Sequence, residues 1–179
     1  MTKKSPVEFS AVYLLHGMAG SPNGSVLQLE LELRACAPNN TYVRPLMPHS
    51  DPTIAPSESV DHLFDLGIPE GALLVGISLG GLAAAKLQEL ERPDLHVICI
   101  NSPTWTGDVE LVVCVMHRVS LYCSNDEVIA GRTEDWPLLA TEAHDLTWLD
   151  GHDIDPHKEA LAHLINCYMR AGCLNWECR

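Results

Sequence analysis

No run of apolar residues in this sequence approaches the roughly 20 that a membrane-spanning helix needs, so we expect no membrane span. Basic residues are also scarce: 11 lysines and arginines stand against 24 aspartates and glutamates, which gives a formal net charge of −13. Nucleic acids and anionic membranes bind basic patches, so we expect neither as a partner. The start of the chain has no apolar segment of the kind found in signal peptides, and we expect a cytoplasmic protein.

The seven cysteines never occur in the C-x-x-C spacing that is typical of zinc sites and redox motifs. Cys99, Cys114 and Cys123 stand in apolar stretches, which predicts buried thiols. Without a signal peptide we expect reduced cysteines, with a Cys173–Cys178 disulfide as the alternative. Glycine-rich phosphate-binding loops are missing as well, and we expect no cofactor.

What the chain does contain is an alternation of short apolar runs with longer helical patterns. Over 179 residues this predicts one domain, 1–179, built as a three-layer α/β/α sandwich around a mostly parallel sheet of about six strands. The expected strands span 10–15, 41–45, 72–77, 95–100, 119–123 and 145–149. The expected helices span 25–36, 57–66 with Ser57 as its cap, 79–90, 109–116, 135–140 and 156–169.

The strongest local motif is the G-x-S-x-G pentapeptide from Gly76 to Gly80, centred on Ser78. An apolar strand is expected directly before it and a helix rich in small residues directly after it. A serine on such a turn is held in a strained conformation with its hydroxyl exposed, as a nucleophile requires. The alternative is an ordinary glycine-rich turn with a buried or capping serine.

An acid and a base for Ser78 are expected after it in the chain, in the order serine, carboxylate, histidine. Asp126 follows an expected strand, where an open α/β sheet places functional groups, and Glu127 is its nearest competitor. His152 follows the last expected strand, and His157 ranks second. In this interpretation His152 takes the Ser78 proton and Asp126 fixes the histidine tautomer.

The turn after the first expected strand, from His16 to Pro22, is a candidate oxyanion loop. The backbone amides of Met18 and Leu79 are the expected donors to an oxyanion. His16, Gly17 and Trp105 are candidates for substrate contact, although His16 also fits a structural hydrogen-bonding role. An ordinary Gly/Ser/Pro turn is the alternative for the whole loop.

The proline-rich segment 45–56 is expected to be a loop, because proline continues neither a helix nor a central strand. It fits the rim of a site, together with Trp105, or a plain surface loop. A local group of histidines and aspartates could bind a divalent cation, but a solvated loop around a catalytic histidine is the preferred interpretation, and we expect no metal. That group consists of His152, Asp153, Asp155 and His157.

Taken in order, these motifs resemble the α/β-hydrolase superfamily. The resemblance rests on His16-Gly17 after the first strand, residues 76–81 after the third, 124–126 after the fifth and Gly151-His152 after the sixth. The pattern is similar to the small lidless serine hydrolases, including the retinoblastoma-binding serine hydrolase type and short bacterial esterases. Two features depart from larger members: few residues precede the first strand, and 101–118 is too short for a separate cap domain.

The resemblance implies a serine hydrolase that cleaves small carboxylic esters or thioesters through a Ser-His-Asp triad and an acyl-enzyme. An uncapped, open site implies short acyl chains or an exposed acyl group on a larger molecule. The alternatives are an amidase, peptidase or lyase on the same triad, or a catalytically silent binding protein on a hydrolase fold. The expected partner is a small ester or acyl substrate, and the oligomeric state is not predicted.

Overall fold

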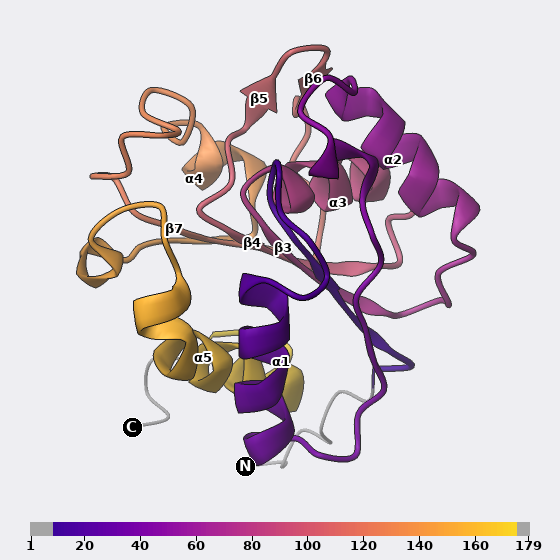
Figure 1. Ribbon diagram of the computed structural model, residues 1–179, viewed down its shortest axis with the longest axis vertical. Coiled ribbons are helices and arrows are strands. Elements are labelled where there is room, and N and C mark those ends of the chain that lie inside the picture. Colours follow the sequence, from indigo (N-terminus) through magenta and orange to yellow (C-terminus); the bar gives the residue numbers. More distant parts are fainter. Residues whose placement is uncertain (1–8, 175–179) are drawn as a thin grey trace.

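A six-stranded parallel sheet forms the centre of the computed structural model, which describes residues 9–174 (Figure 1). Its strand order is β2-β1-β3-β4-β7-β8, and every neighbouring pair is parallel. The chain therefore starts near one edge, reverses between β1 and β3, and proceeds to the other edge. The strands are β1 (Val12–Leu15), β2 (Tyr42–Val43), β3 (Leu73–Ile77), β4 (His96–Ile100), β7 (Arg118–Tyr122) and β8 (Glu142–Asp145).

Helices cover both faces of the sheet, which confirms the predicted three-layer architecture (Figure 1). One face carries α1 (Ser25–Cys36) and α5 (Lys158–Ala171), and the other carries α2 (Pro56–Asp65), α3 (Leu79–Leu90) and the short α4 (Trp136–Leu139). Three 3₁₀ helices join them: η1 (Pro48–Ser50), η2 (Thr147–Leu149) and η3 (Asp155–His157). No helix within residues 9–174 is both long and apolar enough to cross a membrane.

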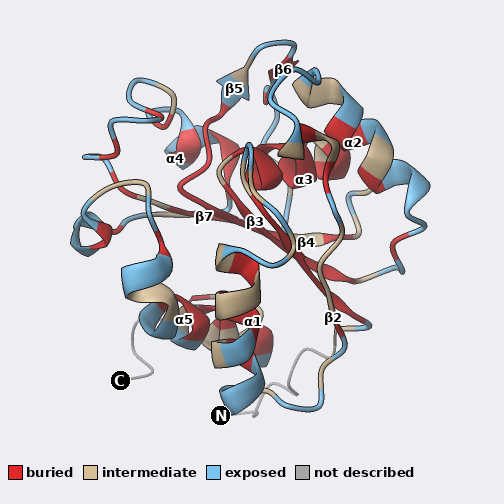
Figure 2. Cartoon of the chain, in the orientation of Figure 1, coloured by how far each residue is buried: buried red, intermediate tan, exposed pale blue. Residues whose placement is uncertain are grey.

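The core is divided by the sheet into two apolar layers (Figure 2). Leu74 points to the layer under α2 and α3, whereas Leu73 and Val75 point to the layer under α1 and α5. All five residues of β3 are buried. A strand buried on both faces needs apolar side chains at every position, which is why this segment reads as a continuous apolar run.

The helix predicted over 109–116 is wrong, because this region forms an antiparallel hairpin of β5 (Trp105–Thr106) and β6 (Val109–Glu110). Gly107 makes the turn at a φ of +55°, a conformation that glycine adopts readily. The chain then continues as a loop whose amides at Val112 and Val113 each donate to Glu89 Oε2 at 3.1 Å. These β-branched valines favour extended backbone over helix.

The last strand also differs from the prediction of 145–149: β8 lies earlier, at Glu142–Asp145, and Thr147–Leu149 is a 3₁₀ turn. Its polar sequence suits the edge of the sheet. The apolar side chains of Leu146 and Leu149 are buried beneath the turn rather than along a strand. The final helix begins at Lys158 rather than Pro156, because η3 holds the proline.

Two smaller predictions, for Ser57 and Cys114, are also corrected. Ser57 does not cap α2: Ala55 precedes the helix, and the Ser57 hydroxyl donates to Asp108 on the hairpin. Cys114 is exposed in the loop after β6, whereas Cys99 and Cys123 are buried as predicted. Cys178 and residues 1–8, on which the disulfide alternative and the signal-peptide prediction depend, lie outside the described residues.

Candidate active site

Ser78 occupies the turn between β3 and α3 with a φ of +51° and a ψ of −122°. Few non-glycine residues adopt a positive φ, and such strain is typical of functional turns. The turn is possible only because its neighbours lack side chains. A Cβ on Gly76 would lie 2.3 Å from the amide nitrogen of Gly81, and one on Gly80 would lie 2.5 Å from the His16 carbonyl.

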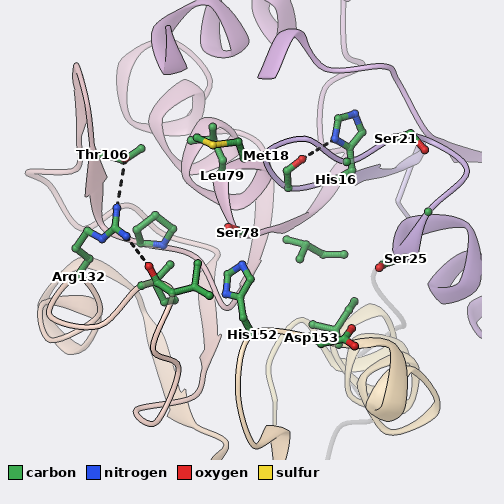
Figure 3. A pocket seen from close by; sticks show the side chains of 18 residues that line it. His16, Met18, Ser21, Ser25, Ser78, Leu79, Thr106, Arg132, His152 and Asp153 are labelled. Carbon is green, nitrogen blue, oxygen red and sulfur yellow. Dashed lines mark hydrogen bonds between the residues drawn. The ribbon is translucent and has the colours of Figure 1, made fainter. Parts of the chain in front are cut away.

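His152 is paired with Asp126: its Nδ1 lies 2.6 Å from the carboxylate Oδ2. Asp126 is almost fully buried just beyond β7, and its Oδ1 accepts the amide of Val128 at 2.9 Å. With Nδ1 donating to the carboxylate, Nε2 of His152 is the nitrogen left to accept a proton. The imidazole is turned toward Ser78 (Figure 3).

The competing acid and base are placed elsewhere. Glu127 is exposed, whereas the neighbouring Asp126 points inward. His157 packs edge-on against Trp148, with ring centroids 5.5 Å apart. Within residues 9–174 no group of three or more histidine, cysteine or acidic side chains is arranged to share a metal ion. The alternative cation site at His152, Asp153, Asp155 and His157 is therefore not formed by these side chains.

The candidate oxyanion loop lies directly against Ser78. A Cβ on Gly17 would be 3.1 Å from the Ser78 Cβ. The amide of Leu79 is the first of α3, where a helix provides no internal acceptor. The amide of Met18 has no acceptor among the described residues, whereas the next amide, of Ala19, donates to the His49 carbonyl at 2.9 Å. Two backbone donors are therefore available beside Ser78.

A buried pair of histidines holds this loop. Nε2 of His16 accepts the amide of Met47 at 3.1 Å, so its Nδ1 carries the proton and donates to the Gly17 carbonyl at 2.8 Å. His49 is fully buried: its Nε2 donates to the His16 carbonyl at 2.7 Å and its Nδ1 accepts the Ser59 hydroxyl. Burial lowers the pKa of His16, and lowers that of His49 to about 4, so both are neutral near pH 7.

Ser78 and His152 open into one cavity of about 570 Å³ (Figure 3). The predicted residues His16, Gly17, Met18 and Leu79 also line it, but Trp105 does not. Nor does any residue of the proline-rich segment 45–56, whose Met47 and His49 lie buried behind the loop instead. The remaining lining residues are Gly20, Ser21, Gly24, Ser25, Ile77, Pro103, Thr106, Val128, Ile129, Arg132, Asp153 and Ile154.

Asn101 is a residue of this region that the sequence analysis missed. It follows β4, is fully buried and has a φ of +43°. Its Oδ1 accepts the amide of Cys123 at 3.0 Å, and its Nδ2 donates to the carbonyl of Gly151 at 2.9 Å. It thus links the end of β7 to the loop of His152. Its position just after a buried strand is the only sequence signal that could have found it.

No protein-family model and no curated protein sequence matches this chain. Several solved structures, in contrast, are similar to it in fold. A protein from Xanthomonas campestris pv. campestris, assigned to the alpha/beta superfamily of hydrolases, is 19% identical with a TM-score of 0.63, covering 86% of this chain and 94% of its own. Mouse alpha/beta hydrolase domain-containing protein 10 is 13% identical with a TM-score of 0.64, covering 93% and 89%.

An alpha/beta hydrolase enzyme from the metagenome of sediments of the Mar Chica lagoon, Morocco, is 15% identical with a TM-score of 0.66, and each chain is covered over 92%. These matches span nearly the whole of both chains, so the likeness concerns the complete architecture and not one motif. The chain therefore has the α/β-hydrolase fold, in a small form without a cap domain.

Proposed function

We propose that this protein is a serine hydrolase that cleaves small carboxylic esters or thioesters, with Ser78 as nucleophile, His152 as general base and Asp126 orienting the base. The observation that carries the proposal is the arrangement around one cavity. A serine on a strained strand–helix turn faces a histidine whose other ring nitrogen is bonded to a buried carboxylate. A nucleophile, a base and an orienting group in this relation are the requirements of acyl transfer.

The proposed reaction has two halves. The Ser78 hydroxyl attacks the ester carbonyl carbon as its proton passes to Nε2 of His152, and the amides of Met18 and Leu79 stabilise the oxyanion. The bond to the leaving group then breaks, and His152 returns the proton to the departing alcohol or thiol. Water, deprotonated by His152, then attacks the acyl carbon; the bond to the Ser78 oxygen breaks, and His152 gives the proton to that oxygen as the carboxylic acid leaves.

The small insertion between β4 and β7 supports a compact substrate. Residues 101–117 hold only the β5–β6 hairpin and a loop, so no domain covers the cavity. Such an opening fits a short acyl chain, or an acyl group exposed on a larger molecule. Amide cleavage and lyase chemistry could use the same three residues, but no contact in the structure favours them over ester hydrolysis.

Labelling with a fluorophosphonate, which reacts covalently with activated serines, tests the proposal. We expect rapid labelling of the wild type, and a rate at least a thousandfold lower in Ser78→Ala and His152→Ala, in line with the loss of a triad member. Ser25→Ala is the matched control, because Ser25 lines the same cavity but lies outside the candidate oxyanion loop and has no proposed role in the reaction. Persistent labelling of folded Ser78→Ala, or none of folded wild type, would refute the assignment.

A further inference from the structure

Arg132 is the one arginine or lysine among the described residues that line the cavity. Its Nη2 donates to the Val128 carbonyl at 2.6 Å, and its Nη1 lies 3.5 Å from the Thr106 hydroxyl. The guanidinium carbon is 5.7 Å from the centroid of the Trp105 ring. A guanidinium has five N–H donors, so these contacts leave most of its donors free.

Arg132 makes no ion pair within residues 9–174, although the chain has more than twice as many acidic as basic residues. Five other basic side chains do pair with carboxylates: Arg34, Arg44, Lys86, Arg92 and Arg118. In so acidic a protein, an arginine that faces a cavity without a carboxylate partner has capacity for an anion from outside.

The backbone beneath Arg132 is fixed. Its amide donates to the Ile129 carbonyl at 3.0 Å, and its own carbonyl accepts both the amide and the hydroxyl of Thr104, at 2.7 and 3.1 Å. The apolar residues Pro103 and Ile129 line the same cavity. A charge beside apolar groups in a cleft interacts more strongly than one in open water.

The cavity has two electrostatically different ends (Figure 3). Arg132 and Thr106 lie at one end, Asp153 and Ser25 lie at the other, and Ser78 and His152 stand between them. One carboxylate oxygen of Asp153, Oδ1, accepts a hydrogen bond of 3.0 Å from the amide of Asp155 in the same loop. An anion held by Arg132 would therefore lie away from this carboxylate while remaining in the same cavity as the nucleophile.

We propose that Arg132 binds a carboxylate of the substrate, so that the preferred substrates are esters or thioesters that also carry a free carboxylate, such as half-esters of short dicarboxylic acids. The inference rests on the proposed function and narrows its substrate class. A carboxylate matches the planar guanidinium through two parallel hydrogen bonds. A single negative charge also suits a protein whose net charge repels highly charged anions.

Paired substrates test this directly. We would compare kcat/KM for the 4-nitrophenyl half-ester of glutaric acid with that for 4-nitrophenyl valerate, which is similar in length but uncharged, after subtracting spontaneous hydrolysis. Wild type is expected to prefer the charged ester, and Arg132→Gln to lower the ratio of the two values roughly tenfold to hundredfold, the range for a hydrogen bond to a charged group. Arg132→Lys should restore part of the ratio.

Two controls separate recognition from structure. A purely structural role for Arg132 would lower both kcat/KM values together and leave their ratio unchanged. Arg170→Gln removes the same charge from an exposed position in the last turn of α5 and should leave the ratio at the wild-type value.

A second pair of substrates shows which part of the substrate reaches Arg132. Acetoxybenzoate carries its carboxylate on the leaving group, and phenyl acetate lacks that carboxylate. If Arg132→Gln lowers the ratio of their kcat/KM values, Arg132 contacts the leaving group; if only the glutarate pair is affected, it contacts the acyl group.

A binding measurement distinguishes failure of the carboxylate site at Arg132 from failure of the serine hydrolase assignment. Titration of Ser78→Ala with monomethyl glutarate by calorimetry needs no turnover, and we expect binding that Arg132→Gln, in the same background, weakens at least tenfold. If labelling identifies an activated Ser78 but Arg132→Gln changes neither the substrate ratio nor this binding, the carboxylate site is refuted. If monomethyl glutarate binds through Arg132 but Ser78 is never labelled, the site stands and the hydrolase assignment fails.

Discussion

Strained residues gather where the chemistry is proposed. Among residues 9–174, five non-glycine residues have a positive φ, and four of them lie on the loops that form this region: Ala19, Ser78, Asn101 and Asp150. Each such conformation costs on the order of 1–3 kcal/mol and persists only where its surroundings hold it. For Asn101 the surroundings include a hydrogen bond from the amide of Cys123 and one to the carbonyl of Gly151, so the side chain is held from both sides of the Asp126–His152 pair.

Asn101→Asp is expected to slow fluorophosphonate labelling at least tenfold. The substitution keeps the acceptor for Cys123 and tolerates the positive φ, but it replaces the donor to Gly151 with a carboxylate oxygen. Two oxygens at hydrogen-bond distance repel, and the His152 loop must shift. The rate is measured at a temperature where circular dichroism shows the protein folded. Exposed Asn125→Asp carries the same charge change, and equal rates for the two variants would contradict the positioning role.

His49 should make the free energy of unfolding fall as the solution is acidified. Its pKa is about 4 in the folded protein and near 6.5 when unfolded, because burial disfavours the charged ring. The unfolded state therefore takes up the proton first. The stability that neutral His49 contributes is complete above pH 6.5 and is lost between about pH 6.5 and 4, by about 2 kcal/mol at pH 5.

Urea unfolding of wild type and His49→Gln at pH 7 and pH 5 measures this contribution. His96 has a similarly lowered pKa and is present in both proteins, so the difference between their pH dependences isolates His49. The variant is expected to lose less stability on acidification than the wild type. An identical loss in both would show that His49 is not the group that titrates.

At the scale of elements, the sequence predicts correctly those helices whose formation depends on residues close together in the chain. Helices α1 and α3 have the expected bounds, 25–36 and 79–90. Their helix-forming and small residues lie within the segments, so the prediction needs no information on distant partners. The predictions over 109–116 and 145–149 are wrong, because a two-residue strand in a hairpin and a polar edge strand depend on partners distant in sequence.

The same distinction applies to the site. Ser78, Asp126 and His152 could be proposed from motif and chain order, and the structure brings the last two into contact. Arg132 and Asn101 could not, since neither stands in a recognisable motif. Their contacts join segments 22 to 50 residues apart, and only the folded sheet brings those segments together.

Arg118 shows how one buried side chain joins several elements. It is fully buried on β7, and burial lowers its pKa. Its nitrogens donate at 2.9 to 3.0 Å to Gln88 Oε1 and to the carbonyls of Ala85, Val113 and Leu139. The acceptors belong to α3, to the loop after β6 and to the end of α4, so the guanidinium ties this side of the sheet together.

Arg118→Met is expected to lower the free energy of unfolding by about 3–5 kcal/mol, because it removes the charge opposite Glu89 and leaves buried acceptors without donors. Urea unfolding monitored by tryptophan fluorescence measures the change. Arg170→Met, at an exposed site on α5, should cost less than about 0.5 kcal/mol. A loss below 1 kcal/mol in Arg118→Met would mean that water or neighbouring groups satisfy those acceptors.

For the whole molecule, strand order decides which loops meet. In a parallel sheet the carboxyl ends of the strands share one edge, and a reversal of strand order opens a crevice there. The reversal between β1 and β3 sets the candidate oxyanion loop beside Ser78, and the order β3-β4-β7-β8 brings in the loops of Asn101, Asp126 and His152. All of these loops follow strands of one sheet, so the proposed site needs no second domain.

Residues 101–117 hold only the β5–β6 hairpin and a loop, so we expect the length of a buried acyl chain to be limited by the cavity itself. A methylene buried in the cavity contributes about 0.8 kcal/mol, or roughly a fourfold gain in kcat/KM, whereas one that extends into water contributes nothing. For 4-nitrophenyl esters from acetate to decanoate, we expect kcat/KM to rise over the first few carbons and then to level off. A steady rise to decanoate would contradict this limit and require an apolar surface beyond the cavity. Met18 and Val128 are exposed and line the cavity, so they would be the first residues to replace with serine. Only an acyl chain that contacts these side chains would then lose affinity.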